Sequence, residues 1–362
     1  MSGNIFGRIL RLATFGESHG KAIGGLLDGF PSGIRIDYDL IKSDMQRRRP
    51  GQSELTSPRN ETDEVEILGG IENGISLGTP IAFTIKNKDI IPEDYNEIRK
   101  AFRPGHADFT WQEKYGISSE SGGGRSSARE TAARVAGGAF AKMLLNHHNI
   151  EIIAFVSQIG DIKIDDDPSK LDLSMIEDSP VRCPSKKYGE MMSLLISSTK
   201  EKGDTLGGIV TCVIKNLPVG LGDPVFNKLH ADLGHAVLGI NAVKGFEIGS
   251  GFKSAMMLGS ESNDEFIIED DHIRTSTNNA GGVQGGISNG EDVFFRVAFK
   301  PISTLMKEQR TIDKDGNEVI LKPKGRHDVC VVPRAVPIVE AMSALVIADH
   351  ILMNKTVKGN RL

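Results

Sequence analysis

The sequence contains little cysteine. Its 362 residues include three cysteines, Cys183, Cys212 and Cys330, and no pair of them has the C-x-x-C spacing. Three widely separated cysteines favour neither a disulfide framework nor a zinc site. We therefore expect a protein of the reducing cytosol that holds no metal ion.

Long hydrophobic runs and an excess of basic charge are also missing. No stretch approaches 18 apolar residues, and residues 1–20 contain no long apolar segment, so neither a membrane span nor a secretion signal is indicated. The formal net charge of −5 argues against nucleic-acid binding, which usually requires a broad basic surface. We expect a cytoplasmic protein that binds neither membranes nor nucleic acid.

The chain is long enough for one large domain or two ordinary ones, and no shift in composition marks a boundary. Helical spacing and strand patterns interleave without strict βαβ order, which favours the α+β class. Residues 103–124 and 51–64 are predicted to be mostly loop. Strands are predicted over residues 7–15, within 21–33, and over 65–70, 80–86, 209–214, 246–248 and 293–299, and a surface hairpin over 311–320. Helices are predicted over residues 39–49, 128–147, 226–240 and 337–354, the last with Pro337 in its first turn.

Residues 122–130, with the sequence GGGRSSARE, resemble an anion-binding loop at the start of a helix. Ser127 and Glu130 have the spacing of a capping box, and a helix start beside glycine attracts phosphate. Arg125 and Arg129 would add charged hydrogen bonds. The alternative is a helix cap after a tight turn. The segment matches neither the Walker A loop nor the G-x-G-x-x-G dinucleotide motif.

Residues 16–20, GESHG, match the G-x-S-x-G pattern of serine hydrolases. That motif requires a helix directly after the serine, whereas glycine and proline interrupt residues 21–33. A hydrolase with Ser18 as nucleophile is therefore the weaker alternative. His19, in this glycine-bearing loop, is a candidate general acid.

Three further groups of polar residues are candidates for a site. His106 lies in a second glycine-bearing loop near Arg103 and is a candidate general acid, the alternative being a structural histidine. The arginines at positions 47–49 end a predicted helix, where they either complement its dipole or reach an anion pocket. Asp328 follows Lys324, Arg326 and His327, as a proton acceptor or as part of a salt-bridge cluster.

Taken together, four segments resemble the chorismate synthase family. They are GESHG, RPGHADF at 103–109, GGGRSSARETAARVAGGA at 122–139, and GRHD at 325–328 followed by RAVP-x-x-EA. They occur in the order that this family shows, and the resemblance extends from about residue 6 to about residue 352. The resemblance implies a β-α-β sandwich formed by one domain, residues 1–362, and a homotetramer.

The resemblance also implies a reaction. Members of this family use reduced FMN to convert 5-enolpyruvylshikimate 3-phosphate into chorismate and phosphate by 1,4-elimination, without net redox change. The reduced flavin lends electron density to the substrate and is restored in each turnover. Nothing in the sequence indicates an added reductase domain, so we expect an external flavin reductase, with NADPH acting only indirectly as the source of reduced flavin.

Site residues are carried over by matching motifs. His106 would protonate the departing phosphate, His19 would act as an acid toward the reduced flavin, and Asp328 would help to remove the proton that reaches flavin N5. Several fixed cations suit a pocket that holds a phosphate, two carboxylates and the FMN phosphate. Residues implied in substrate binding are Arg48, Arg49, Arg103 and Arg129. Residues implied in FMN binding are Arg125, Ser126, Ser127, Asn241, Ala242, Gly285, Lys300, Pro301, Ile302, Ser303, Thr304 and Arg326.

Three positions depart from the family pattern: Glu54, Ile302 and Val329 stand where arginine, threonine and proline are common. Glu54 removes an expected anion contact. A flavin or phosphometabolite carrier that keeps the pocket but has lost activity is therefore an alternative, although His19, His106 and Asp328 are retained.

Overall fold

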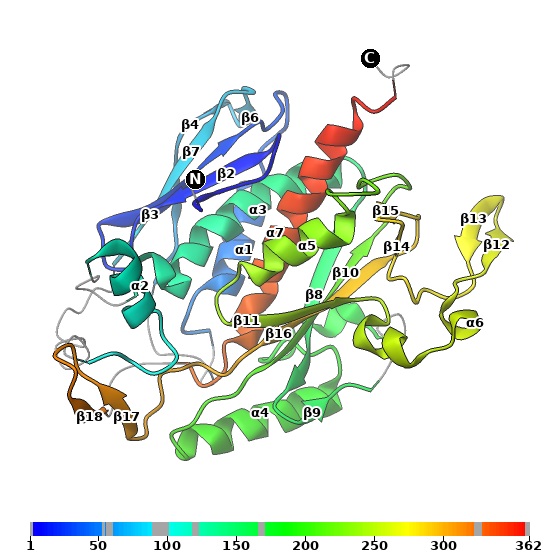
Figure 1. The fold of residues 1–362 in the computed structure, drawn as a ribbon. Coiled ribbons are helices and arrows are strands. Elements are labelled where there is room, and N and C mark those ends of the chain that lie inside the picture. The colour runs from blue at the N-terminus through cyan, green and yellow to red at the C-terminus, as the bar shows by residue number, and fades with distance from the viewer. Residues whose placement is uncertain are drawn as a thin grey trace.

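Two antiparallel sheets enclose a layer of helices (Figure 1). The computed structural model describes residues 3–52, 55, 61–88, 101–117, 123–165, 171–321 and 328–358, and structural statements refer to these residues. The buried apolar side chains of both sheets and of the helices between them form one continuous core. The predicted α+β class and β-α-β sandwich are confirmed.

The first sheet has the strand order β1-β2-β3-β7-β4. Its predicted glycine-rich strand is β3, where a Cβ at Gly25 would lie 2.5 Å from the ring of Phe83 on β7, so only glycine allows this close pairing. The predicted strand 7–15 starts later, because Gly7, with φ +95°, turns the chain between β1 and β2. The strands are β1 Ile5–Phe6, β2 Arg11–Phe15, β3 Ala22–Asp28, β4 Val65–Gly69 and β7 Ile81–Lys86.

The second sheet has the order β11-β16-β10-β8-β9. Along β16, Val293, Phe295, Val297 and Phe299 are buried and alternate with partly exposed residues, so one face of this strand packs into the core. The strands are β8 Glu151–Ile159, β9 Ile162–Lys163, β10 Gly208–Lys215, β11 Val243–Ile248 and β16 Val293–Phe299.

The central layer consists of α1 Tyr38–Arg48, α3 Thr131–Asn146, α5 Leu229–Leu238 and α7 Val332–Asn354. Helix α3 packs against the first sheet and against α7, and α7 packs against β8 and β10. A Cβ at Gly138 of α3 would lie 2.4 Å from the Cβ of Ala341 on α7. The absence of a side chain at Gly138 therefore sets how closely the two helices approach.

Helix α7 begins earlier than predicted. Pro333 occupies its first turn, and Pro337 lies inside the helix. Pro337 has no N–H to donate to the carbonyl of Pro333, and Arg182 supplies the missing donor through Nη1 at 2.7 Å. By length and hydropathy α7 is able to cross a membrane, but 94% of its most apolar stretch is buried inside the protein, as expected for a core helix.

Helix α2, Asp108–Tyr115, occupies part of the segment predicted to be mostly loop. It has no buried residue, so its sequence lacks the apolar periodicity that indicates a packed helix.

The predicted 311–320 hairpin is confirmed as β17 Gln309–Ile312 and β18 Glu318–Leu321. The remaining elements are α4 Lys186–Glu201, α6 Gly259–Ser262, the pairs β5 Ile71–Glu72 with β6 Ile75–Ser76, β12 Phe266–Glu269 with β13 His272–Thr275 and β14 Val283–Gln284 with β15 Ile287–Ser288, and the 3₁₀ turns η3 Gly124–Ser126, η4 Ala128–Glu130, η6 Leu173–Met175 and η7 Gly251–Met256.

Candidate active site

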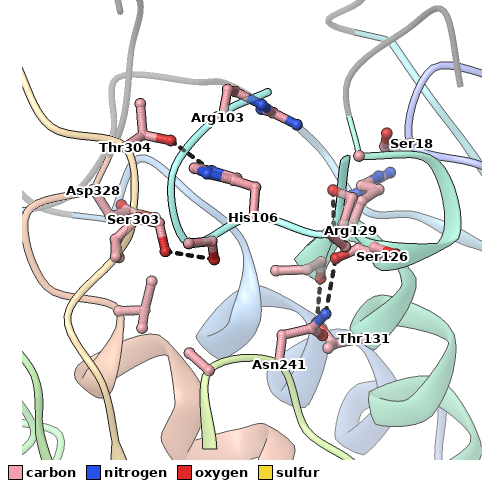
Figure 2. Close-up of a pocket in the computed structure, with 18 of the residues that line it drawn as sticks. Ser18, Arg103, His106, Ser126, Arg129, Thr131, Asn241, Ser303, Thr304 and Asp328 are labelled. Carbon is pink, nitrogen blue, oxygen red and sulfur yellow. Dashed lines mark hydrogen bonds between the residues drawn. The ribbon is translucent and has the colours of Figure 1, made fainter. Parts of the chain in front are cut away.

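A cavity of about 880 Å³ lies at one end of the helical layer, a volume typical of sites for small molecules. Its wall combines the loop at 16–20, the end of α1, the segment 101–112, the start of α3, and the segments 240–242, 299–304 and 328–338. Arg103 and His106 come from the segment 101–112, Arg129 from the start of α3, and Asp328 from the segment 328–338 (Figure 2).

Two helices begin at this cavity. Arg129 lies in η4 directly before α3, and Arg334 lies in the first turn of α7, and both line the cavity. The N-terminal end of a helix carries partial positive charge. Both helices therefore add to the arginine charge that favours anions.

Ser127 caps the helix as predicted, but the reciprocal half of the capping box is not formed. The Ser127 hydroxyl accepts a hydrogen bond from the N–H of Arg129 at 3.3 Å. Glu130 instead accepts from Nε of Arg134 at 3.1 Å, because the i, i+4 position brings that guanidinium close.

Asp63 lies between two of the predicted substrate arginines. One of its carboxylate oxygens accepts from Arg48 and the other from Arg129, and its side chain is fully buried. Burial opposes ionisation, but the two guanidinium groups outweigh it and lower the pKa of Asp63. Burial, with the nearby Arg334 and Arg129, lowers the pKa of Arg48 to about 10. Glu61, which is also buried and lines the cavity, lies 3.8 Å from Nη2 of Arg129. The two carboxylates therefore hold Arg48 and Arg129 in place and offset part of their charge.

Arg103 is held by the first turn of α2. Its Nε and Nη2 donate to the two carboxylate oxygens of Asp108 at 2.7 and 2.6 Å. This bidentate geometry fixes the plane of the guanidinium and leaves other N–H groups of Arg103 for a ligand.

His106 is neutral in the free protein. Its Nδ1 lies 3.2 Å from the carbonyl of Pro104, and its Nε2 lies 2.9 Å from the hydroxyl of Thr304. A carbonyl only accepts, so Nδ1 carries the proton and Nε2 accepts from Thr304, a contact visible in Figure 2. Burial, joined by the charge of Arg103, lowers the pKa of His106 to about 4.

Asp328 and Lys300 both form hydrogen bonds with other residues of the cavity wall. Asp328 accepts a hydrogen bond from Nη1 of Arg334, whose Nε donates to the carbonyl of Arg48 at 3.2 Å. Lys300 donates to the hydroxyl of Ser303. Arg334 thus fixes Asp328 relative to the end of α1.

Three buried polar atoms of the cavity wall have no hydrogen-bond partner among the described residues: Ser18 Oγ, Arg48 Nε and Asn241 Oδ1. Buried polar atoms are normally paired. Asn241 donates through Nδ2 to the carbonyl of Ser126 at 3.0 Å, which leaves its oxygen for a donor group. The lining therefore fits a ligand that carries both hydrogen-bond donors and acceptors, such as FMN or a phosphorylated hydroxy acid.

The cavity brings most of the predicted site residues together. Those that line it are His19, His106, Asp328, Arg48, Arg103, Arg129, Ser126, Ser127, Asn241, Ala242, Lys300, Pro301, Ile302, Ser303 and Thr304. Arg326 and Glu54 lie outside the described residues. Val329, one of the departures from the family pattern, is buried in the core.

Arg49, Arg125 and Gly285 are not among the described residues that line the cavity. Arg125 donates to the carbonyl of Gly16 at 3.2 Å and to Thr14, so its charge is directed at the end of β2. Gly285 lies in the turn between β14 and β15.

The serine hydrolase alternative is not supported by the chain path after Ser18. The motif is followed by strand β3, whereas a nucleophile elbow leads from a strand into a helix. Ser18 lines the cavity but lacks that geometry.

The sequence did not indicate several residues that hold this site. Asp63 and Asn87 contact Arg129 from 66 and 42 positions away, and no local pattern indicates such contacts. Glu61, Trp111, Lys314 and Arg334 also line the cavity. Of these residues, Arg334 could have been found from the sequence, because it begins the RAVP segment that resembles the family.

Comparisons with known proteins identify the family of this chain. A sequence model of the family described as chorismate synthase matches residues 10–352. The chain is 55% identical over 353 residues to the chorismate synthase of Parabacteroides distasonis, covering 98% of this chain and 99% of that protein. It is also 55% identical over 358 residues to that of Christiangramia forsetii, covering 99% and 100%. A solved structure titled "Crystal Structure of Chorismate Synthase" matches with a TM-score of 0.77 and 32% identity, covering 97% of this chain and 94% of that chain.

Proposed function

The chain belongs to the chorismate synthase family, and we propose that its cavity converts 5-enolpyruvylshikimate 3-phosphate into chorismate and phosphate by 1,4-elimination. One observation carries the proposal. Arg48, Arg103, Arg129 and His106 converge on one cavity, where the substrate brings a phosphate and two carboxylates.

The arginines bind and orient the substrate. Asp108 holds Arg103, and Asn87, Asp63 and the carbonyl of Lys86 hold Arg129, so the N–H groups that remain have fixed directions. Fixed donors lose little entropy when an anion binds and hold the reacting bond in one orientation. Arg48 adds a buried Nε that has no partner in the described part of the chain.

His106 supplies a proton to the leaving phosphate. The free protein holds this ring neutral, and a phosphate dianion beside Nε2 raises the pKa of the ring because the opposite charge favours the protonated form. The ring therefore takes up a proton only when the substrate is bound. It then acts as a general acid toward the phosphate oxygen.

Asp328 and His19 are the remaining proton-handling groups. Arg334 orients Asp328, which serves as a proton acceptor. His19 lies in the loop at 16–20 on the wall of the same cavity and serves as an acid toward the cofactor.

Reduced FMN fits the part of the lining that contains Asn241 and the segment 300–304. When bound, it supplies electron density to the substrate as phosphate leaves. Ser126, Ser127, Asn241, Ala242 and residues 300–304 would hold it, together with Arg326. Ser127 caps the helix through its hydroxyl, so its contact with the cofactor would run through the backbone. Arg125 holds the loop at 16–20 in place. We propose that NADPH acts only through an external flavin reductase.

An anaerobic assay tests the function. Purified protein is mixed with chemically reduced FMN and 5-enolpyruvylshikimate 3-phosphate, and phosphate release and chorismate absorbance are followed together. His106→Ala should slow turnover by about 10²-fold or more while FMN still binds. FMN binding without any product from the wild-type protein would overturn the lyase and favour the carrier alternative.

The assembly proposed is a homotetramer of one-domain chains, residues 1–362, in the cytoplasm. Support comes from exposed apolar side chains between η7 and β13. This part of the chain projects from the rest of the molecule (Figure 1). Patches of this kind mark interaction surfaces. The shared core of both sheets supports the single domain.

A further inference from the structure

Asn87 follows strand β7, and its amide contacts two separate parts of the cavity wall. Nδ2 donates to the carbonyls of Glu17 at 3.0 Å and Gly20 at 2.8 Å. Oδ1 accepts from Nε of Arg129 at 2.8 Å. The amide orientation is fixed, because carbonyl oxygens only accept and a guanidinium only donates. One side chain thus joins the loop at 16–20 to an arginine of the cavity.

The first sheet supports Asn87 rigidly. Its N–H donates to the carbonyl of Lys21 at 3.3 Å, which extends the pairing of β3 and β7 beyond Ala22 and Lys86. The carbonyl of Lys86 accepts from Nη2 of Arg129 at 3.3 Å. The end of β7 therefore contacts Arg129 through two consecutive residues.

The loop at 16–20 is held on both sides of the residues that reach the cavity. Arg125 donates to the carbonyl of Gly16, and Asn87 donates to those of Glu17 and Gly20. Ser18 and His19 lie between these fixed carbonyls and line the cavity. Their position therefore depends on the Asn87 amide.

We infer that Asn87 is a positioning residue: it fixes the loop that carries Ser18 and His19 relative to the guanidinium of Arg129. The inference rests on the proposed function, since it gives His19 and Arg129 roles in one reaction. Asn87 is not among the described residues that line the cavity, so it acts through these two parts of the wall. The contacts of Asn87 with the loop, made by Nδ2 and called here the loop arm, affect turnover. The contact of Oδ1 with Arg129, called the arginine arm, affects substrate binding.

Two substitutions separate the arms. Asn87→Asp places an oxygen against two carbonyl oxygens, so the loop arm is lost, while its other oxygen, now charged, still accepts from Arg129. We expect its kcat to fall about tenfold or more while KM for 5-enolpyruvylshikimate 3-phosphate changes less than about threefold. Asn87→Ala loses both arms, and we expect kcat to fall and KM to rise about fivefold or more. Steady-state kinetics with reduced FMN under anaerobic conditions measures both.

The matched control is Asn216→Asp. Asn216 also donates through its amide to a carbonyl, that of Asn149 at 2.9 Å, and neither residue lines the cavity in the described part of the chain. We expect wild-type kcat and KM. Thermal unfolding of all variants checks that they fold, and Asn87→Ala still tests the inference if Asn87→Asp does not fold.

Three outcomes would overturn the inference. The first is a kcat within twofold of wild type in either folded variant, and the second is an equal loss of kcat with the same KM in both variants, as a general loss of structure predicts. If the wild-type protein itself forms no chorismate, the proposed function fails and the inference fails with it. Product from the wild type together with undiminished product from Asn87→Asp overturns the inference alone.

Discussion

His106 illustrates how one residue connects burial to chemistry. Because its pKa is about 4 in the free protein, the ring is neutral at pH 7 and gains its proton only beside an anion. We expect the His106 resonances in NMR titrations to have a midpoint near pH 4 without ligand. The midpoint should rise by at least about one unit with the substrate bound.

The His106→Asn variant identifies the resonances by their loss. A midpoint near the ordinary value of about 6.5 in the ligand-free protein would contradict this account. The sign of the stability effect follows as well. The unfolded ring binds a proton below about pH 6.5 and the folded ring only near pH 4, so this residue lowers the stability of the protein as the pH falls through that window.

Asp63 carries the second prediction at this scale. Asp63→Asn removes the anion between Arg48 and Arg129, and the side chain of Arg48 is only 2% exposed. Breaking a buried pair leaves an uncompensated charge, so we expect the free energy of unfolding to fall by about 3–5 kcal/mol. Urea unfolding at pH 7 measures this change.

The control is Asp28→Asn, which breaks the exposed pair with Arg11 and should cost about 1 kcal/mol or less. The pKa of Asp63 is lowered in the folded protein. The contribution of Asp63 to the stability of the fold is therefore complete above its ordinary pKa of about 4 and is lost as the pH falls further. A cost for Asp63→Asn no larger than that of the control would show that the buried triad does not stabilise the fold.

At the scale of elements, the break in the hydrogen bonds of α7 gives a double-mutant test. Arg182→Ala removes the donor to the carbonyl of Pro333. The carbonyl is then buried without a partner, which lowers the free energy of unfolding by about 1–3 kcal/mol. In a Pro337→Ala background, the new N–H at position 337 pairs with that carbonyl, so Arg182→Ala should cost at least about 1 kcal/mol less. Urea unfolding of the two single variants and the double variant gives the coupling energy, and additivity within about 0.3 kcal/mol would refute the compensation.

The β17–β18 hairpin fixes the segment that leads to Arg103. Thr311 donates to the carbonyl of Phe102, and the N–H of Phe102 donates to Ile312 at 3.0 Å. Thr311→Val keeps the side-chain volume and loses the hydroxyl, so we expect KM for the substrate to rise about threefold to tenfold with a stability loss of about 1 kcal/mol. Thr277→Val, which removes a hydrogen bond to Asp264 instead, is the control and should leave KM unchanged. Equal KM values for the two variants would show that the hairpin has no effect on substrate binding.

At the scale of the whole molecule, the exposed apolar side chains predict self-association. Phe252, Met256 and Ile268 are at least 80% exposed on η7 and β12, and the neighbouring Phe266 and Ile273 are also exposed. We expect a tetramer by light scattering, and dissociation after Ile268→Lys. Leu194→Lys, at a single exposed leucine on α4, should leave the mass unchanged. A monomeric wild-type protein would contradict the proposed assembly.

The sequence predicted those parts of the fold whose pattern is local. The strands β10 and β16 alternate or are continuously apolar, and α3 follows a serine cap, so each was located within a few residues. Helix α2 has no buried face, and every residue of α7 from Ala335 to Leu352 is buried, so neither shows the apolar stripe from which helix boundaries are predicted.

The same distinction applies to the site. His106, Arg103 and Arg129 belong to segments that carry their own signal. The groups that orient them, Asp63, Asn87 and Arg334, become neighbours only when the two sheets and the helical layer assemble. Long-range pairing of this kind leaves no periodicity in the chain.

The contact between Gly138 and Ala341 has a consequence for how this protein changes under mutation. Helices α3 and α7 both begin at the cavity, so the spacing set by this contact in the core also sets the distance between Arg129 and Arg334. A substitution at Gly138 would thus alter catalysis without altering any residue that contacts a ligand. Genetic screens for weakened enzyme should recover changes in the helical layer as well as in the cavity, and the core variants should be recognised by their sensitivity to temperature.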